Sequence, residues 1–190
     1  MSGMTPSRHP LRQGLVRDER GQGVVEFALI LPVLLLVLVG ILEFGSIYSN
    51  VISMRQGVRE AGRQGSVAKF GSTTSCGLII DGTSPSDNIK MLMCLVKDQS
   101  GVQDNVKIRV GFTDANLNAY TEDSTGYVAG NAIVVCAAYP LTSLTGLFQP
   151  FLGGRVAKTK AAFRIEKADP AGATGGGERD PSDQNWAWCT

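Results

Sequence analysis

The stretch RGQGVVEFALILPVLLLVLVGILEFG, residues 20–45, decides the architecture that we expect for this chain. It contains an uncharged apolar run from Phe27 to Leu42, with Glu26 directly before the run and Glu43 directly after it. About 16 residues of helix rise about 24 Å, somewhat less than the roughly 30 Å of a bilayer's hydrocarbon core. The run therefore predicts a membrane-spanning helix that needs flanking residues to complete the span.

Two ordinary alternatives to a specialised membrane segment are a removable signal peptide and a plain signal anchor. No A-x-A-like cleavage site follows the run, and an acid at its start is unusual for a removable signal. The plain, uncleaved signal anchor stays open. Pro32 lies inside the run and predicts a kink, because proline lacks a backbone N–H and crowds the preceding turn.

Helix-compatible spacing continues beyond the run to about residue 68. An apolar stripe and several small residues suit close packing of this stem: Val51, Met54 and Val58, with Gly57, Ala61, Gly62 and Gly65. The alternative is a flexible stem, since each interior glycine weakens a helix by about 1 kcal/mol relative to alanine.

Composition excludes one class of partner. The 190 residues are 18% charged with a formal net charge of +1, which gives no electrostatic case for binding nucleic acid, since a polyanion needs a concentrated basic face. The residues after about Phe70 can bury only a small core, for which cross-links would help.

The four cysteines, Cys76, Cys94, Cys136 and Cys189, all follow the apolar run. Their wide spacing lacks the close ligand pairs of a structural zinc site and fits disulfides in an oxidising compartment. We favour a local Cys76–Cys94 bridge and a Cys136–Cys189 bridge that anchors the C-terminus, although the spacing also allows buried thiols. Basic residues are nearly balanced on the two sides of the run. The cysteines therefore decide the predicted topology of a single-pass cytoplasmic membrane protein, with its N-terminus cytoplasmic and its larger part extracytoplasmic.

Past Phe70 the pattern predicts a small α+β domain. A helix is expected from Ser86 or Asp87 to Gly101, with Ile89, Leu92, Met93 and Val96 on its buried side. Strands are expected in residues 105–112, 127–139 and 155–166, because apolar and polar residues alternate there or form a buried run. These elements predict an antiparallel sheet with a helix on one face.

Two segments of this domain allow more than one interpretation. Between the last two strands, Leu144, Leu147, Phe148 and Phe151 either cover the open face of the sheet, which we favour, or form an apolar patch for a neighbouring subunit. The Gly/Pro/Asp-rich tail, residues 168–190, is expected to be mobile. Its terminal Trp186 and Trp188 dock either on this domain or on a partner.

No pattern typical of catalysis is present in the sequence. The single histidine, His9, precedes the apolar run, and no Walker loop, HExxH or GxSxG occurs. Asp114, Glu122 and Asp123 lie in one predicted loop, where solvated acids are the ordinary interpretation and weak calcium binding the alternative. We expect no enzyme activity, no cofactor and no metal site.

The N-terminal residues resemble type IV prepilins, and most closely the TadE-like minor pilins (pseudopilins) of the tight-adherence, or Flp, pilus system. The similar positions span about 25 residues: Gly21-Gln22, Val25 to Leu29, Leu31-Pro32, Gly40-Ile41 and Glu43-Phe44-Gly45. A weaker resemblance continues in REAGRQGSVA, residues 59–68, and KTKAAFRIE, residues 158–166.

The resemblance implies a non-catalytic pilus component that a prepilin peptidase cuts between Gly21 and Gln22. Glu26, as the fifth mature residue, would offset the new amino terminus of an adjacent subunit, since paired charges at the hydrocarbon edge cost far less than lone ones. Phe27, Pro32 and Glu43 belong to the same assembly and recognition motif. Glu43 has a less clear role, either at the outer interface or as a solvated carboxylate at a helix end.

The same resemblance implies the organisation of the chain. Residues 1–21 form a cytoplasmic leader, 22–70 a transmembrane and stem helix, 71–167 a pilin-like head, and 168–190 the tail. Expected partners are membrane lipid, the prepilin peptidase, other pilins or minor pilins, and Tad assembly-platform proteins, and the expected role is pilus assembly and surface adhesion. A membrane-tethered extracytoplasmic binding protein with an uncleaved anchor is the alternative.

Overall fold

The computed structural model describes residues 21–71, 76–101, 105–169, 171–182 and 186–190. The chain forms two compact units, divided between Ile41 and Leu42. The expected leader, residues 1–20 with His9, lies outside the described residues.

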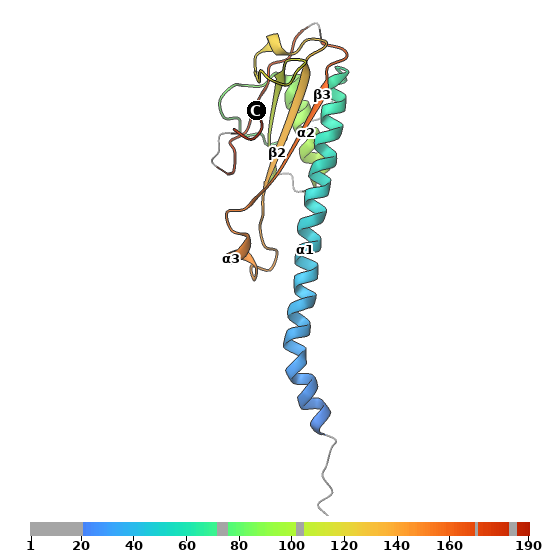
Figure 1. Cartoon of the computed structure of the whole chain (residues 1–190), viewed down its shortest axis with the longest axis vertical. Helices are drawn as coiled ribbons and strands as arrows, with labels where there is room; N and C mark the ends of the chain where they lie inside the picture. Colours follow the sequence, from blue (N-terminus) through green and yellow to red (C-terminus); the bar gives the residue numbers. More distant parts are fainter. Residues whose placement is uncertain (1–20, 72–75, 102–104, 170, 183–185) are drawn as a thin grey trace, which may run out of the picture. The chain divides into compact units, whose positions relative to one another are not determined.

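Helix α1 spans Gln22–Ser66, so it begins at the predicted cleavage position and ends close to the expected residue 68. In its second half, Met54 and Val58 of the predicted stripe are fully buried. The glycines of the stem allow close packing: a Cβ on Gly65 would lie 2.6 Å from Ile133 and 2.8 Å from Leu92. The stem is therefore part of the head's core rather than a flexible linker (Figure 1).

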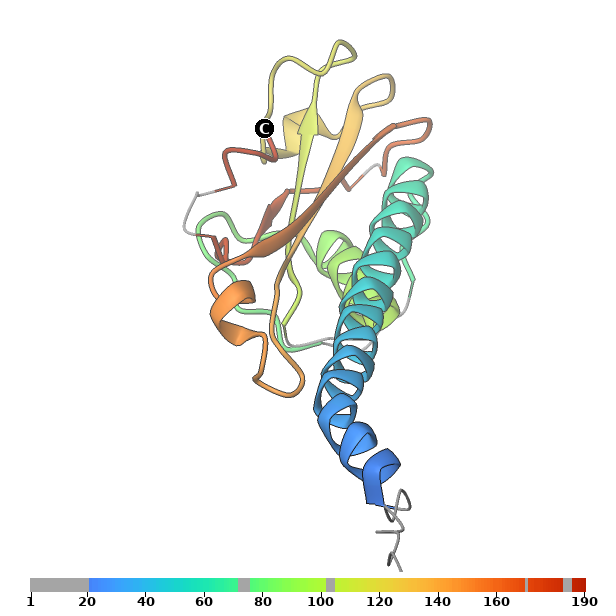
Figure 2. The same ribbon diagram turned by 60° about the horizontal axis from the view of Figure 1, so that its bottom comes forward.

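Helix α2, Asp87–Ser100, forms as the amphipathic pattern predicts. Ser86 precedes it in an extended conformation, and Gly101 ends it in the left-handed region, with φ of 67°, where glycine avoids a steric penalty. Ile89, Leu92, Met93 and Val96 are buried on one side. Figures 1 and 2 show α2 beside the second half of α1, on the same side of the sheet.

The sheet contains the three expected strands and one that was not expected. The strands are β1 (Lys107–Thr113), β2 (Ala132–Pro140), β3 (Val156–Arg164) and β4 (Gly176–Gly177), all antiparallel, in the order β3-β2-β1-β4. Short helices η2 (Ser124–Gly126) and α3 (Gln149–Leu152) lie in the connections. The predicted α+β class is confirmed.

Central strand β2 is buried on both faces. Ile133, Val135, Ala137 and Tyr139 pack toward the helices in the main core. Val134, Cys136 and Ala138 alternate with them and pack against Trp186 and Cys189 in a second, smaller cluster. The C-terminal segment thus closes the side of the sheet that the helices leave open.

The tail was expected to be mobile, but its described residues 171–182 and 186–190 include a strand and a buried tryptophan. Gly177 of β4 pairs with Arg109 of β1, and Trp186 is 2% exposed with its ring N–H donating to the carbonyl of Glu178 at 2.7 Å. The glycines permit this, because a Cβ on Gly177 would lie 2.6 Å from the carbonyl oxygen of Ile108. Glycines that predict mobility here serve close approach to β1.

Both favoured disulfides form, Cys76–Cys94 and Cys136–Cys189, with Cα–Cα distances of 5.4 and 6.0 Å. The first attaches the segment after the stem to α2, and the second holds the tail on β2. Trp186 docks on its own domain, which answers one question that the sequence left open.

The favoured interpretation of the β2–β3 connection, residues 141–155, is wrong. Leu144, Leu147 and Phe151 are 76%, 55% and 74% exposed and do not cover the sheet. The tail occupies that face instead, held there by its disulfide. Leu144, Leu147 and Phe151 are therefore left on the surface, whereas Leu152 of the same connection is buried.

Candidate functional site

Two features of this chain are candidates for a functional site. One is the apolar first half of α1, and the other is a buried carboxylate that follows it. The first half of α1 is long and apolar enough to cross a membrane, and its most apolar window is not buried inside the structure. Leu29, Val33 and Leu42 are 73%, 64% and 70% exposed. Contiguous exposed apolar surface of this kind marks a membrane or protein interface.

The expected processing and assembly residues lie at the start of α1. Gly21 is exposed directly before α1 begins at Gln22, and a Cβ on Gly21 would meet no other group of the described residues within 4 Å. Glu26 and Phe27 are also exposed, one turn into the helix. The helix is assigned without interruption through Pro32, and the kink there stays a prediction.

Glu43 is buried, with 1% of its surface exposed, so it is not a solvated carboxylate at a helix end. Its Oε1 accepts the backbone N–H of Leu144 at 2.6 Å. Its Oε2 accepts the backbone N–H and the hydroxyl of Thr145 at 3.2 and 3.1 Å. A carboxylate binds such donors more strongly than a neutral acceptor would, so Glu43 fastens the β2–β3 connection to α1.

An aromatic contact supports the same attachment. The rings of Phe44 and Phe148 lie 5.7 Å apart between centroids, at an interplanar angle of 53°. This is within the range of favourable tilted aromatic pairs. The connection is thus held to α1 at two successive helix positions, Glu43 and Phe44, by residues that the sequence pattern did not pair.

Comparison with protein families decides what kind of segment this is. Residues 21–63 match the TadE-like protein family. The match begins at Gly21 and includes Glu26, Pro32 and Glu43, so the expected resemblance is confirmed for this TadE-like segment. No curated protein and no solved structure gives a significant match to the chain.

The head that follows the TadE-like segment contains a buried ion pair. Lys97 of α2 and Glu178, beside β4, are 2% and 0% exposed at their side chains, with 2.9 Å between Nζ and Oε1. Glu178 also accepts the backbone N–H groups of Ile79 and Ile108 at 3.3 and 3.2 Å, and Lys107 lies 3.5 Å away. The partners of Glu178 are thus two lysines and two backbone N–H groups, which gives this carboxylate a structural role.

The sequence patterns did not predict this ion pair, although the position of Lys97 in its helix was informative. Lys97 lies four residues after Met93, on the buried side of α2, where a lone cation needs a partner. Glu178 lies in a glycine-rich segment without periodicity, so no pattern predicted that it would be the partner.

The acids of the 114–123 loop do not converge on a cation. Asp114 accepts backbone N–H groups of its own loop, from Asn116 and Asn118 at 3.1 and 2.7 Å. Glu122 is bound to Arg109, with Nη2 to Oε2 at 3.0 Å. In the part of the chain that the structure describes, no group of three or more His, Cys, Asp or Glu is placed to hold a metal.

Tyr120, which lies beside the Arg109–Glu122 ion pair, is not placed to act as a base. Burial and the charge of Glu122 raise the pKa of Tyr120, and the hydrogen bond to Glu122 raises the pKa of the Arg109 guanidinium. Both groups therefore keep their protons at neutral pH and contribute to structure.

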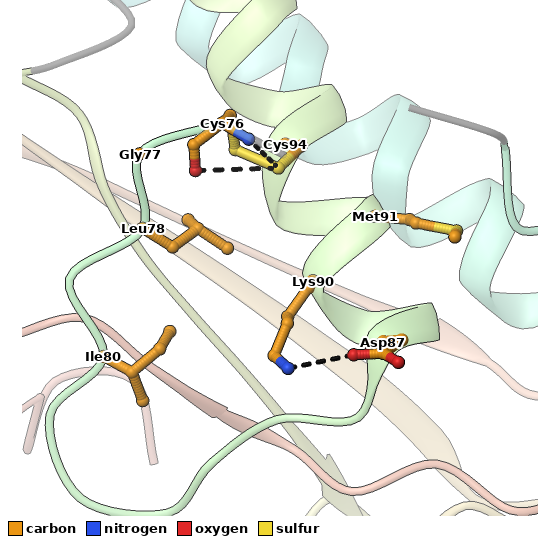
Figure 3. Close-up of a pocket in the computed structure, with 8 residues that line it drawn as sticks. All are labelled: Cys76, Gly77, Leu78, Ile80, Asp87, Lys90, Met91 and Cys94. Carbon is orange, nitrogen blue, oxygen red and sulfur yellow. Dashed lines mark hydrogen bonds and ion pairs between the residues drawn. A yellow bond between two sulfur atoms is a disulfide. The ribbon is translucent and has the colours of Figure 1, made fainter. Parts of the chain in front are cut away.

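One open hollow lies beside the Cys76–Cys94 disulfide (Figure 3). Its volume is about 540 Å³, within the usual range for small-ligand sites. Leu78 and Ile80 form one side of it and α2 the other, where Lys90 is paired with Asp87 at 2.9 Å. The described residues that line the hollow offer apolar contact and one ion pair, with no unpaired nucleophile or general base among them.

Proposed function

We propose that this protein is a non-catalytic, membrane-anchored minor pilin or pseudopilin of a Tad (Flp) pilus. The single observation that carries the proposal is the TadE-like segment, which starts at Gly21, one residue before α1 begins at Gln22. The family resemblance brings with it cleavage after Gly21 by a prepilin peptidase, and partnership with other pilins and Tad assembly-platform proteins.

The start of α1 suits such processing. Gly21 is exposed, and none of the described residues crowds it, which would leave the bond to Gln22 within reach of a peptidase at the membrane surface. Cleavage would leave a new ammonium group four residues before Glu26. A positive terminus and a carboxylate at the hydrocarbon edge stabilise each other when they are on adjacent subunits.

The head supports a role outside the cytoplasm. It contains two disulfides and no free cysteine among the described residues, as is usual for proteins in oxidising compartments. This favours a cytoplasmic N-terminus and an extracytoplasmic head. Surface adhesion through the assembled pilus follows as part of the same proposal.

The test of processing is the intact mass of the membrane-extracted protein, made with and without the cognate prepilin peptidase. We expect loss of residues 1–21 only when the peptidase is present. Gly21→Ala should abolish the cut, whereas the matched Gly23→Ala, also in open space, should leave it intact. Equal cleavage of Gly21→Ala and the parent would reject pilin-type processing.

Assembly is tested separately with Glu26→Gln, which removes the charge with little change in size. The variant should be inserted and cut normally, yet the amount recovered in sheared pilus fractions or cross-linked to other pilins should fall by roughly tenfold, the effect of about 1.4 kcal/mol. Unchanged recovery would show that the Glu26 charge is not an assembly contact.

The second candidate is a membrane-tethered binding protein that keeps its leader. The observation in its favour is the apolar hollow beside Cys76–Cys94. An uncut chain in both samples, together with retention of a small apolar ligand by the purified protein, would favour this alternative over the pilus component.

A further inference from the structure

The β2–β3 connection and the adjacent part of α1 share an unusual surface. Leu144, Leu147 and Phe151 are exposed on the connection, and Phe44 and Tyr48 of α1 are 55% and 67% exposed. The Phe44–Phe148 contact and the Glu43 hydrogen bonds bring these two elements together. We name the five exposed residues the apolar collar.

The two sequence segments that form the collar are almost without charge, and the next charged residue of α1, Arg55, lines one hollow together with Phe44 and Tyr48. Residues 140–154 contain no Asp, Glu, Lys or Arg, and residues 27–54 of α1 contain only Glu43. The β2–β3 connection covers that one carboxylate and satisfies it with three donors. A connection exposed to water would gain nothing from excluding charge over 15 successive positions, whereas charge is costly near lipid.

The length of the apolar run indicates where the membrane boundary falls. The run from Phe27 to Leu42 rises about 24 Å, short of the hydrocarbon core by roughly 6 Å. Phe44 and Tyr48 follow Leu42 along α1 within about 9 Å of helix rise. With Glu26 at the other hydrocarbon edge, as in the proposed function, the missing length falls at the level of the collar. Aromatic side chains at this depth are typical of membrane–water interfaces.

We propose that the apolar collar inserts into the interfacial region of the membrane, with lipid headgroups and the upper acyl chains as its partner. Leu147 and Phe151 enter the boundary as the apolar face of an interfacial segment does, while the connection's backbone stays within reach of water. Because the β2–β3 connection covers Glu43, the part of α1 that follows Leu42 can also lie at the membrane boundary without exposing a charge. This inference rests on the membrane anchoring in the proposed function.

The test places an environment-sensitive nitrobenzoxadiazole label at single new cysteines, L147C and F151C, in the full chain. The protein is reconstituted in phosphatidylethanolamine–phosphatidylglycerol vesicles, and quenching by doxyl-labelled lipid is measured. The matched control is L117C. Leu117 is 58% exposed and lines one hollow with Ala132, the first residue of β2, whereas the β2–β3 connection follows the other end of that strand, roughly 30 Å away. Quenching at 147 and 151 should exceed that at 117 by roughly twofold or more.

A label at L35C, in the apolar run, distinguishes failure of the collar proposal from failure of the proposed membrane anchor. Quenching at 35 without quenching at 147 and 151 would overturn the collar proposal and leave the membrane anchor intact. No quenching at 35 would overturn both. If quenching at 147 and 151 falls as protein density rises, while aqueous iodide is also excluded, a second copy covers the collar and the lipid assignment is wrong.

Discussion

Removal of the Glu178 carboxylate, by Glu178→Met, is the most informative perturbation of the head. The variant leaves the ammonium of Lys97 buried, with the carbonyl of Gly77 at 3.4 Å as its remaining hydrogen-bond partner among the described residues. An uncompensated buried charge costs about 3–5 kcal/mol of the free energy of unfolding. It also leaves the buried N–H group of Ile108 without its acceptor, at a cost of about 1–3 kcal/mol, while the part-buried N–H group of Ile79 loses the same acceptor at a smaller cost. We expect a total loss of at least about 4 kcal/mol.

The partner variant, Lys97→Met, should cost much less. Glu178 would keep the ion pair with Lys107 at 3.5 Å and both backbone N–H groups. Loss of one charge-assisted hydrogen bond is worth about 1.5–3 kcal/mol, and the methionine retains the apolar contacts of the lysine stem. The double variant should be less destabilised than the sum of the two single variants, because no ammonium is then left unpaired.

The assay is denaturant unfolding of the full chain in detergent micelles, followed by tryptophan fluorescence. The only tryptophans are Trp186 and Trp188, and the ring N–H of Trp186 donates to the carbonyl of Glu178, so the signal reports directly on this region. Equal costs for Glu178→Met and Lys97→Met, or a cost below about 1 kcal/mol for Glu178→Met, would refute the reasoning.

Three further predictions concern the disulfide, a buried phenol and the Glu43 contact. Replacing both Cys136 and Cys189 by Ala should lower the free energy of unfolding by about 4 kcal/mol, as loop closure over 53 residues implies; an unchanged denaturation midpoint would contradict this. Burial, with a smaller contribution from the charge of Asp169, raises the pKa of Tyr127 from 10.0 to about 12, and its hydroxyl donates to the carbonyl of Gly65 near the end of α1. Since the folded state holds that proton more tightly, stability should fall as pH rises from 10 toward 12, and Tyr127→Phe should lack that part of the slope in alkaline unfolding curves. Glu43→Leu should speed hydrogen exchange of the backbone amides in residues 141–155 by roughly tenfold or more, as loss of a charge-assisted hydrogen bond implies, without affecting the sheet; unchanged exchange would show that the carboxylate does not hold the connection.

Much of this architecture could be predicted from local patterns. The periodicity of Ile108, Val110 and Phe112 predicted β1, and the Ser86-to-Gly101 pattern predicted α2. These predictions succeed because each element buries a face set by its own period. The TadE-like segment was likewise predicted from contiguous residues.

The tail and the Glu43 site could not be predicted in this way. Gly177 forms a strand only because Arg109 of β1 is there to pair with it, and Glu43 is buried only because Thr145 reaches it from 102 positions away. Such contacts depend on tertiary placement, which composition and periodicity do not encode. The glycine-rich composition of the tail therefore indicated mobility where the fold uses close backbone approach.

With the head outside the cytoplasm, as proposed above, the two disulfides would become available at different times as the chain is made and exported. Cys76–Cys94 could close once residue 94 had crossed the membrane, since its loop is local and includes only the start of the head. Cys136–Cys189 requires residues up to 189, so β2 waits with one face uncovered until the tail arrives. During that interval an oxidising enzyme could wrongly join Cys136 to an earlier cysteine. Early closure of the local bridge removes both earlier thiols from that competition, so the short loop protects the correct pairing of the long one.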